Sequence, residues 1–398
     1  MKNNQSNIIK LVCTNCKEEF DHKEKHTLCK SCSKVLFVKY DLEEAKQTLS
    51  KKSIQNRNVH NIWRLHEIMP VIESKFRFSL GEGGTPLLHL INSENHFGLK
   101  KLFLKDEGQN PTGTFKSRGL CAAVSRGIEL GIQDFAVPTA GNAGAALSAY
   151  TAYTGTNAHV YMPDDTPELL QSAVTSMGGD LELVPGLITD AARKCTLAIE
   201  KNNWFDVSTL KEPYRVEGKK TMALEVIEQL DWNVPDILIY PTGGGTGIIG
   251  MWKAFDELES IGLIGSDRPR MVSVQSSGCA PIVKAFHEGR KTASFWEKAN
   301  TFAPGLRVPA AVGDYLILRA IYESKGIAVE TTDSEIFSAM KKLAKTEGIM
   351  QSPEGAATYA ALLKLVDSGF ISLSDSIVLF GTGSGLIYPE FWLIKDFH

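Results

Sequence analysis

The chain has 398 residues, with 43 Lys and Arg against 46 Asp and Glu, so its formal net charge at pH 7 is −3. Hydrophobic residues make up 43% and charged residues 22% of the chain, which is typical of a globular protein and excludes a disordered or collagen-like one. A dedicated binder of nucleic acid or anionic membranes needs a surplus of Lys and Arg. We therefore expect a small-molecule partner and no nucleic acid.

The seven cysteines are unevenly distributed, with four in the first 32 residues. The other three lie in apolar, helix-like sequence and are expected in the core; they are Cys121, Cys195 and Cys279. An odd number of cysteines in this arrangement favours a reducing compartment over a disulfide scaffold. The first residues carry no apolar signal segment, and no run of about 18 uncharged apolar residues occurs. The sequence therefore predicts a cytoplasmic protein with no membrane partner.

The first 42 residues are expected to form a separate small module. Two Cys-x2-Cys pairs, separated by twelve residues, have the spacing of knuckles that bring four thiolates to one zinc ion. The four candidate ligands are Cys13, Cys16, Cys29 and Cys32. The alternative is a ribbon of reduced cysteines that no longer binds metal. His22 and His26 lie between the pairs and could serve as replacement ligands, but they are expected to be exposed. A strand is predicted at 35–42.

The following residues, 43–75, are expected to be a solvated connecting segment with a short helix at 62–69. Beyond them the sequence alternates between predicted strands and helices. Strands are predicted at 100–107, 133–139, 157–163 and 180–186, and helices at 117–131, 143–155, 166–178 and 189–203. A strand, a glycine loop and a helix follow over 236–255, with further strands at 269–275 and from 375. This alternation predicts parallel sheets covered by helices on both faces.

In open parallel sheets, ligands bind at the carboxyl ends of the strands, so the loops there are candidate sites. The first such loop, KDEGQNPTGTFKSRG at 105–119, places Lys116 at the start of a helix. A cation is unfavourable at a helix N-terminus, so this position favours a neutral amine suited to forming a Schiff base. The alternative is a surface lysine that follows a turn.

Three further loops carry chemistry. PTAGNAG at 138–144 contains Asn142, which could bind an aromatic hydroxyl, and its backbone N–H groups could hold a carboxylate. TGGGTG at 242–247 suits a phosphate monoester cradled by backbone N–H groups and the Thr246 hydroxyl. GTGSG at 381–385 offers the Thr382 hydroxyl to a ring nitrogen. Each loop could instead be a turn that needs glycine for its backbone alone.

In this order, the four loops resemble those of the fold-type II pyridoxal-phosphate enzymes, the tryptophan synthase β family, and most closely those of threonine synthases. The resemblance implies that Lys116 forms the Schiff base with pyridoxal 5'-phosphate, that Asn142 faces the 3-oxygen of the cofactor and that Thr382 faces its ring nitrogen. The implied phosphate loop consists of Gly243, Gly244, Gly245, Thr246 and Gly247. The stretches at 79–87, 212–221, 278–286 and 352–362 are also similar to threonine synthases.

The resemblance implies an α/β fold of the fold-type II pyridoxal-phosphate class, with two doubly wound α/β domains, the cofactor between them and a zinc-ribbon-like module in front. We expect the module at 1–42, a large cofactor-binding domain at 43–110 and 215–398, and a smaller domain at 111–214 that carries the asparagine loop. Relatives of this class also imply a homodimer.

The activity implied is conversion of O-phosphohomoserine and water to threonine and phosphate. Thr139 and Arg215 are expected to bind the substrate. Lys219 and Lys220 are further candidates for its phosphate, but are expected on an exposed helix face. At two positions the chain departs from the threonine synthase pattern, and both bear on which substrate it binds. Ala140 replaces a hydroxyl residue, and Glu212, in the segment 208–212, would repel a phosphate unless it points away. The alternatives are a serine or threonine dehydratase, an O-phosphoserine-using synthase, or a binding protein without catalysis.

Overall fold

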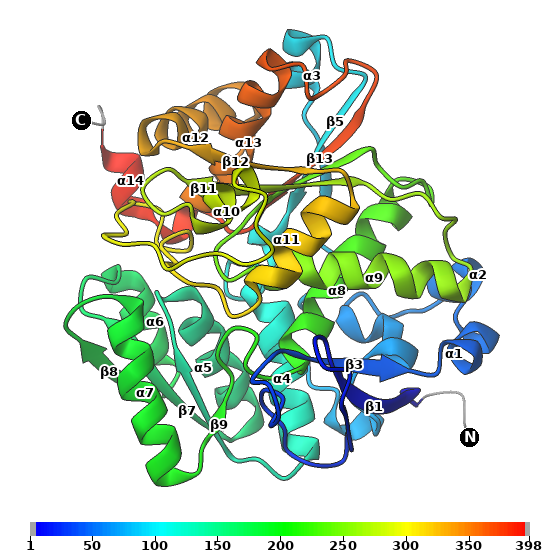
Figure 1. The fold of residues 1–398 in the computed structure, drawn as a ribbon, viewed down its shortest axis with the longest axis vertical. Helices are drawn as coiled ribbons and strands as arrows, with labels where there is room; N and C mark the ends of the chain where they lie inside the picture. Colours follow the sequence, from blue (N-terminus) through cyan, green and yellow to red (C-terminus); the bar gives the residue numbers. More distant parts are fainter. Residues whose placement is uncertain (1–4, 395–398) are drawn as a thin grey trace.

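The computed structural model describes residues 5–394, and its strands form three sheets (Figure 1). The largest has the order β12 (Ile327–Thr331), β11 (Arg270–Ser276), β10 (Ile237–Pro241), β13 (Ser376–Gly381), β5 (Lys101–Asp106) and β4 (Leu87–His89). The second has the order β8 (Asp180–Val184), β7 (Asn157–Pro163), β6 (Asp134–Pro138) and β9 (Phe205–Asp206). The third has the order β2 (Glu19–Phe20), β1 (Ile8–Cys13) and β3 (Leu36–Tyr40).

The two larger sheets are parallel, apart from β4, which pairs antiparallel with β5. Every residue of the central strand β10 is buried, because helices cover both faces of its sheet. All strands and helices predicted from residue 100 to 255 are present, as are β11 and β13. The fold is therefore of the predicted α/β type, but its largest sheet is mixed rather than wholly parallel, because β4 is antiparallel to β5.

The helices fill the space around and between the sheets (Figure 1). They are α1 (Leu42–Thr48), α2 (Lys51–Gln55), α3 (Ile91–Phe97), α4 (Lys116–Glu129), α5 (Asn142–Thr154), α6 (Glu168–Ser176), α7 (Ile188–Asn202), α8 (Tyr214–Gln229), α9 (Thr246–Ile261), α10 (Pro281–His287), α11 (Asp314–Glu323), α12 (Asp333–Glu347), α13 (Pro353–Asp367) and α14 (Pro389–Leu393). Short 3-10 helices are η1 (Ile62–Ile68), η2 (Ser74–Phe76), η3 (Glu107–Gln109) and η4 (Gly385–Ile387).

Helices α4 and α8 cross in close contact. A Cβ atom on Gly218 would lie 2.0 Å from the carbonyl oxygen of Arg118, and one on Gly119 would lie 3.1 Å from that of Arg215. Side chains at these two positions would push the helices apart. The glycines therefore let the start of α4 approach α8.

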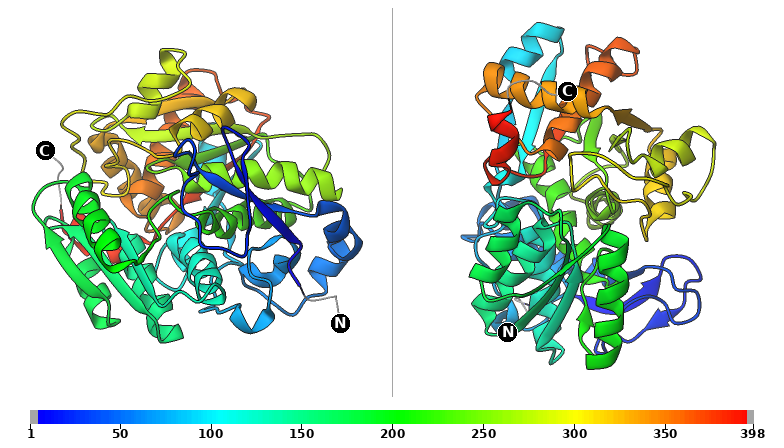
Figure 2. Two further views of the ribbon diagram at one scale, coloured as in Figure 1. Left: turned by 60° about the horizontal axis from the view of Figure 1, so that its bottom comes forward. Right: turned by 90° about the vertical axis from the view of Figure 1, so that its left-hand side faces the viewer.

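The N-terminal sheet protrudes on one side of the molecule, drawn in dark blue in Figure 2, and packs against the helices. The hydroxyl of Tyr40 in β3 donates to Oε2 of Glu217 in α8 at 2.9 Å, and Arg126 in α4 donates to the carbonyl of His22 at 2.6 Å. His22 and His26 are only 7% and 6% exposed, so the prediction that they are exposed is wrong. His22 is buried against Arg126 of α4, whereas His26 packs edge-on against Phe20, with ring centroids 5.2 Å apart.

The connecting segment also differs from the prediction. A short helical element is present as η1, but much of the segment 62–71 is buried in the main core rather than solvated. The buried apolar residues are Ile62, Trp63, Leu65, Ile68, Met69 and Val71. Arg64, His66 and Glu67 interrupt this apolar set, and the residues before it are rich in Lys, Gln and Asn, so composition averaged over 43–75 concealed its burial.

Candidate active site

Two adjoining cavities lie where the loops at the carboxyl ends of the parallel strands meet, and both are lined by Lys116 and Asn142. Lys116 follows β5, Asn142 follows β6, the glycine loop follows β10 and Thr382 follows β13. The inner cavity has a volume of about 40 Å³ and the outer one about 180 Å³. The fold thus brings together four loops that are far apart in the sequence.

Lys116 is the first residue of α4 and is half-buried. Its pKa is lowered to about 7, first by burial and then by the positive charge of Arg215, while the Glu354 carboxylate acts in the opposite direction. A large fraction of the amine is therefore neutral and nucleophilic near pH 7.

Asn142 begins α5, directly after Gly141, whose φ of 113° is strained for any residue with a side chain. Its Nδ2 atom donates to the hydroxyl of Tyr388 at 2.6 Å. The Oδ1 atom is buried and has no hydrogen-bond partner within residues 5–394. Thr139 lies in the wall of the outer cavity, where its Oγ1 accepts from the N–H of Gly141 at 3.1 Å.

Most of the glycine loop lines the inner cavity, as Gly243, Gly244, Gly245 and Thr246. Gly247 lies behind the loop instead, where a Cβ atom would approach the hydroxyl oxygen of Tyr240 to 2.0 Å. The loop ends at the N-terminus of α9, where unpaired backbone N–H groups and the helix dipole favour an anion. This arrangement can hold a phosphate group.

Thr382 is 4% exposed and lines the inner cavity, as predicted from its position after a strand. Beside it lies Glu354, which the sequence analysis did not select. Its Oε1 accepts from the N–H of Gly305 at 2.7 Å, and burial raises its pKa. The resemblance at 352–362 was the available signal, because Glu354 lies in that stretch.

Arg215 is fully buried but does not line either cavity. Its Nη1 donates to the carbonyl of Val207 at 2.6 Å, whereas Nε and Nη2 have no partner among the residues described. Glu212 accepts from the N–H groups of Tyr214 and Arg215 and so caps α8. Its carboxyl is fully buried and its pKa is raised to about 7, chiefly by that burial. Glu212 therefore points away from the cavities.

The residues just before Glu212 line the outer cavity instead, as Ser208, Thr209 and Lys211. The ammonium of Lys211 lies 3.3 Å from Oδ2 of Asp206, which offsets part of its charge. The rest of the outer cavity is mostly apolar, with Ala140 in its wall. This segment therefore offers two hydroxyl groups and an ammonium to an anionic group.

Lys219 and Lys220 are buried, contrary to the prediction of an exposed helix face. Lys220 pairs with Glu217 at 2.6 Å and with Glu257 at 2.8 Å beneath the N-terminal sheet. The amine of Lys219 donates to the carbonyl of Phe115. Burial lowers the pKa of Lys219 well below its usual value, and the charges of Lys116 and Arg215 lower it further.

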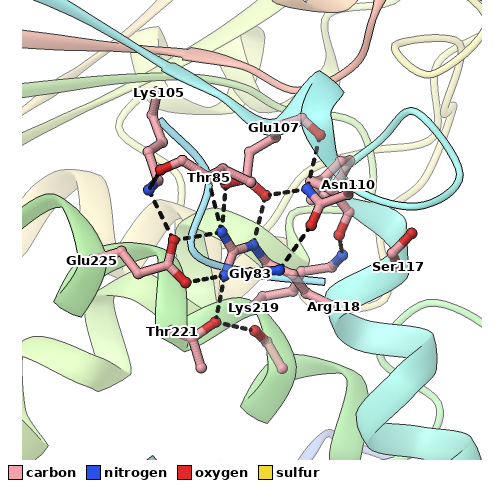
Figure 3. A network of polar contacts seen from close by, with 12 residues as sticks. Gly83, Thr85, Lys105, Glu107, Asn110, Ser117, Arg118, Lys219, Thr221 and Glu225 are labelled. Carbon is pink, nitrogen blue, oxygen red and sulfur yellow. Dashed lines mark hydrogen bonds and ion pairs between the residues drawn. The ribbon is translucent and has the colours of Figure 1, made fainter. Parts of the chain in front are cut away.

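A buried network surrounds Arg118, two residues after Lys116 (Figure 3). The guanidinium donates to both carboxylate oxygens of Glu107, at 2.6 and 2.7 Å, and to both of Glu225, at 2.5 and 2.7 Å. Lys105 adds a third charge pair, 2.8 Å from Glu225. Because these residues come from β5, η3, α4 and α8, the network fixes the first turn of α4 and hence the backbone of Lys116.

The four N-terminal cysteines form one cluster, with all four sulfur atoms within 4.8 Å of one another. Their burial differs, since Cys16 is exposed and Cys13 is buried. The other three cysteines are buried, as predicted.

Within the described part of the chain, no helix is long and apolar enough to cross a membrane.

Comparison with solved structures shows the same fold in a serine racemase and a serine ammonia-lyase. Maize serine racemase superposes with a TM-score of 0.66 at 22% identity, over 77% of this chain and 91% of that protein. An L-serine ammonia-lyase from Rhizomucor miehei superposes with a TM-score of 0.67 at 22% identity, over 77% of this chain and 97% of that protein. This similarity defines the fold and not the substrate.

Sequence comparison is more specific. The model of the family "Pyridoxal-phosphate dependent enzyme" matches residues 78–383. Threonine synthase of Methanocaldococcus jannaschii is 36% identical over 95% of this chain and 93% of its own length. Threonine synthase of Methanosarcina acetivorans is 34% identical over 96% and 92%. The chain therefore belongs to the pyridoxal-phosphate-dependent enzyme family, in the branch that contains the threonine synthases.

Proposed function

We propose that the chain is a pyridoxal-phosphate-dependent threonine synthase, which converts O-phosphohomoserine and water to threonine and phosphate. The observation that carries this function is the inner cavity, where Lys116, Asn142, the glycine loop and Thr382 meet. The relatives named threonine synthase, 36% and 34% identical over nearly the whole chain, indicate the reaction.

The residues present fit the cofactor. The amide of Asn142 has hydrogen-bonding capacity left for a ligand, because its buried Oδ1 has no partner in residues 5–394. A Cβ on Gly243 would come within 2.2 Å of the carbonyl oxygen of Gly305, and one on Gly244 within 2.4 Å of the methyl group of Thr209. Only glycine permits this compact loop, which presents backbone N–H groups to a phosphate.

When bound, pyridoxal phosphate supplies an electron sink for chemistry next to the amino-bearing carbon. We assign Lys116 as the amine that attaches the cofactor, and, once released, as the general base for the α-proton. Thr382 would hydrogen-bond the ring nitrogen. A hydroxyl does not enforce protonation of that nitrogen as a carboxylate would, which favours elimination and replacement over transamination.

The atoms of the reaction balance without a further reagent. The C–O bond at the γ carbon breaks and its electron pair leaves with phosphate. The β carbon loses one proton and gains the hydroxyl of water, the γ carbon gains a proton, and the second proton of water goes to phosphate. We propose that Thr139 and the N-terminus of α5 bind the substrate carboxylate, and that Arg215 contributes positive charge at the phosphate end.

The decisive experiment offers O-phosphohomoserine, O-phosphoserine, serine and threonine to the holoenzyme in parallel. Phosphate release from the first, with threonine as product, is expected. Ammonia from serine or threonine instead would make the enzyme a dehydratase, the alternative that the mostly apolar outer cavity and Ala140 favour. Wild-type protein with cofactor should be yellow, and Lys116→Ala colourless; a colourless wild type would refute the assignment.

We also propose that the cysteine cluster binds a structural zinc ion in a zinc-ribbon-like module at 1–42. Four thiolates within 4.8 Å of one another support a tetrahedral site with no open position for catalysis. Elemental analysis should find one zinc per chain, and Cys16→Ser should lower that content. A metal-free wild type purified with zinc present would contradict the proposal.

The remaining proposals concern the domain boundaries, the cellular location, the partner and the oligomeric state. We divide the catalytic part into a large domain, 43–110 with 215–398, and a small one, 111–214, which is supported by the membership of the two parallel sheets. Seven cysteines without a disulfide among the described residues support a cytoplasmic location. The net charge of −3 supports a small metabolite rather than nucleic acid as partner. Light scattering should show a homodimer, as the family resemblance implies.

A further inference from the structure

Tyr388 connects the C-terminal segment to the loop that carries Asn142. Its hydroxyl accepts the 2.6 Å hydrogen bond from Nδ2 of Asn142, a residue 246 positions earlier. Asn142 begins α5 beside the four-stranded sheet, whereas Tyr388 follows β13 of the six-stranded sheet. Figure 1 shows the red segment with α14 on the same side of the molecule as α5 and α6. One hydrogen bond therefore joins a helix beside the four-stranded sheet to the segment that follows the six-stranded sheet.

The surroundings of Tyr388 hold its ring in place. The residue is completely buried, its N–H donates to the carbonyl of Gly385, and its ring stacks on Phe391 with centroids 5.9 Å apart. Burial raises the pKa of Tyr388 well above its usual value, and the negative charge of Glu354 raises it further. The hydroxyl therefore stays protonated near neutral pH, and the contact with Asn142 does not switch in that range.

The contact restricts the amide of Asn142. A planar amide with one end fixed cannot rotate, so its second N–H and its Oδ1 atom keep one direction. Oδ1 is buried without a partner within residues 5–394, so this end of the amide can still accept a hydrogen bond. Asn142 lines both cavities, so the ligand would lie there.

We propose that Tyr388 is a positioning residue that orients the amide of Asn142 toward the ring of the cofactor. The proposal rests on the proposed function, since it assumes that pyridoxal phosphate occupies the inner cavity. Tyr388 does not line either cavity and acts only through Asn142. Because the amide is already fixed before the cofactor binds, the binding free energy does not include the entropic cost of ordering this side chain.

The test titrates cofactor-free protein with pyridoxal phosphate and follows quenching of its six tryptophans. Tyr388→Phe removes a single oxygen atom and should weaken binding about fivefold to tenfold, the effect of one buried hydrogen bond. Asn142→Ala should weaken it at least as much. In the double variant the loss should equal that of Asn142→Ala alone, because Tyr388 acts through this amide. Tyr153→Phe, which alters an exposed tyrosine of α5, should bind like wild type.

A second readout is the pH at which the visible band of the cofactor-loaded protein changes. Tyr388→Phe and Asn142→Ala should move this pH in the same direction, which a loss of stability alone would not do. Independent, additive losses in the double variant would overturn the proposal. If wild type binds no cofactor, the proposed function fails too; if wild type binds and turns over substrate while Tyr388→Phe matches it in both readouts, only the positioning role fails.

Discussion

The amine of Lys219 donates a hydrogen bond to the main-chain carbonyl of Phe115, the residue directly before Lys116. Both lysine amines lie against the ring of Phe115, with Nζ of Lys219 4.0 Å and Nζ of Lys116 4.5 Å from its centroid. Helix α8 thereby holds the backbone from which α4 begins. A lysine that the sequence placed on an exposed face thus supports the candidate catalytic lysine.

Replacing Lys219 should therefore reduce stability at the start of α4. Lys219→Met keeps most of the side-chain volume but leaves the carbonyl of Phe115 without its donor. We expect the free energy of unfolding in urea to fall by about 1–3 kcal/mol, the cost of an unpaired buried polar group. Lys201→Met, at an exposed position of α7, is the matched control and should leave it unchanged. Equal unfolding midpoints for the two variants would contradict this prediction.

The lowered pKa of Lys116 predicts how cofactor attachment depends on pH. Only the neutral amine reacts, so the attachment rate should rise with pH through about 7 and level off above it. Stopped-flow absorbance on cofactor-free protein measures this rate. Arg215→Gln removes a positive charge and should move the midpoint upward by about one pH unit, while Arg193→Gln, at an exposed site, should not. A wild-type midpoint near 10, that of an ordinary lysine, would exclude the proposed environment.

Breaking the network around Arg118 should be more costly than any surface change. Arg118→Met leaves the carboxylates of Glu107 and Glu225 buried without their main partner. We expect a loss of about 3–5 kcal/mol in the free energy of unfolding. Arg193→Met should change it by less than about 0.5 kcal/mol, because its pair with Asp190 is exposed. Chemical denaturation of both variants measures the difference, and equal values would show that the network is dispensable.

The glycine loop should tolerate no side chain at its first position. In Gly243→Ala the new methyl group would collide with the carbonyl oxygen of Gly305, so the loop must move. Affinity for pyridoxal phosphate should fall by at least tenfold, measured by fluorescence titration, because the phosphate-binding N–H groups shift. Gly265→Ala adds a methyl group where no atom lies within 4 Å and should bind normally. Normal affinity in Gly243→Ala would exclude this loop as the phosphate site.

Much of the fold followed from local patterns. The alternation of apolar strands and helices predicted α4–α7 and β5–β8 because each is specified by periodicity within some fifteen residues. The loops around Lys116, Asn142 and Thr382 follow parallel strands, and the topology of such sheets requires their carboxyl ends to meet. The sequence between 281 and 374 carries no prediction of a helix or strand, so α13 and Glu354 at its start come from the structure alone.

The sequence by itself thus determined the α/β class, the family and the loops that carry the chemistry, because short-range spacing encodes them. Only the tertiary structure decided which polar side chains are buried. Lys219, His22 and Tyr388 meet partners about 100 residues or more away in the sequence. No local pattern specifies such a contact, since whether a polar group can be buried depends on the donor or acceptor that the fold brings to it.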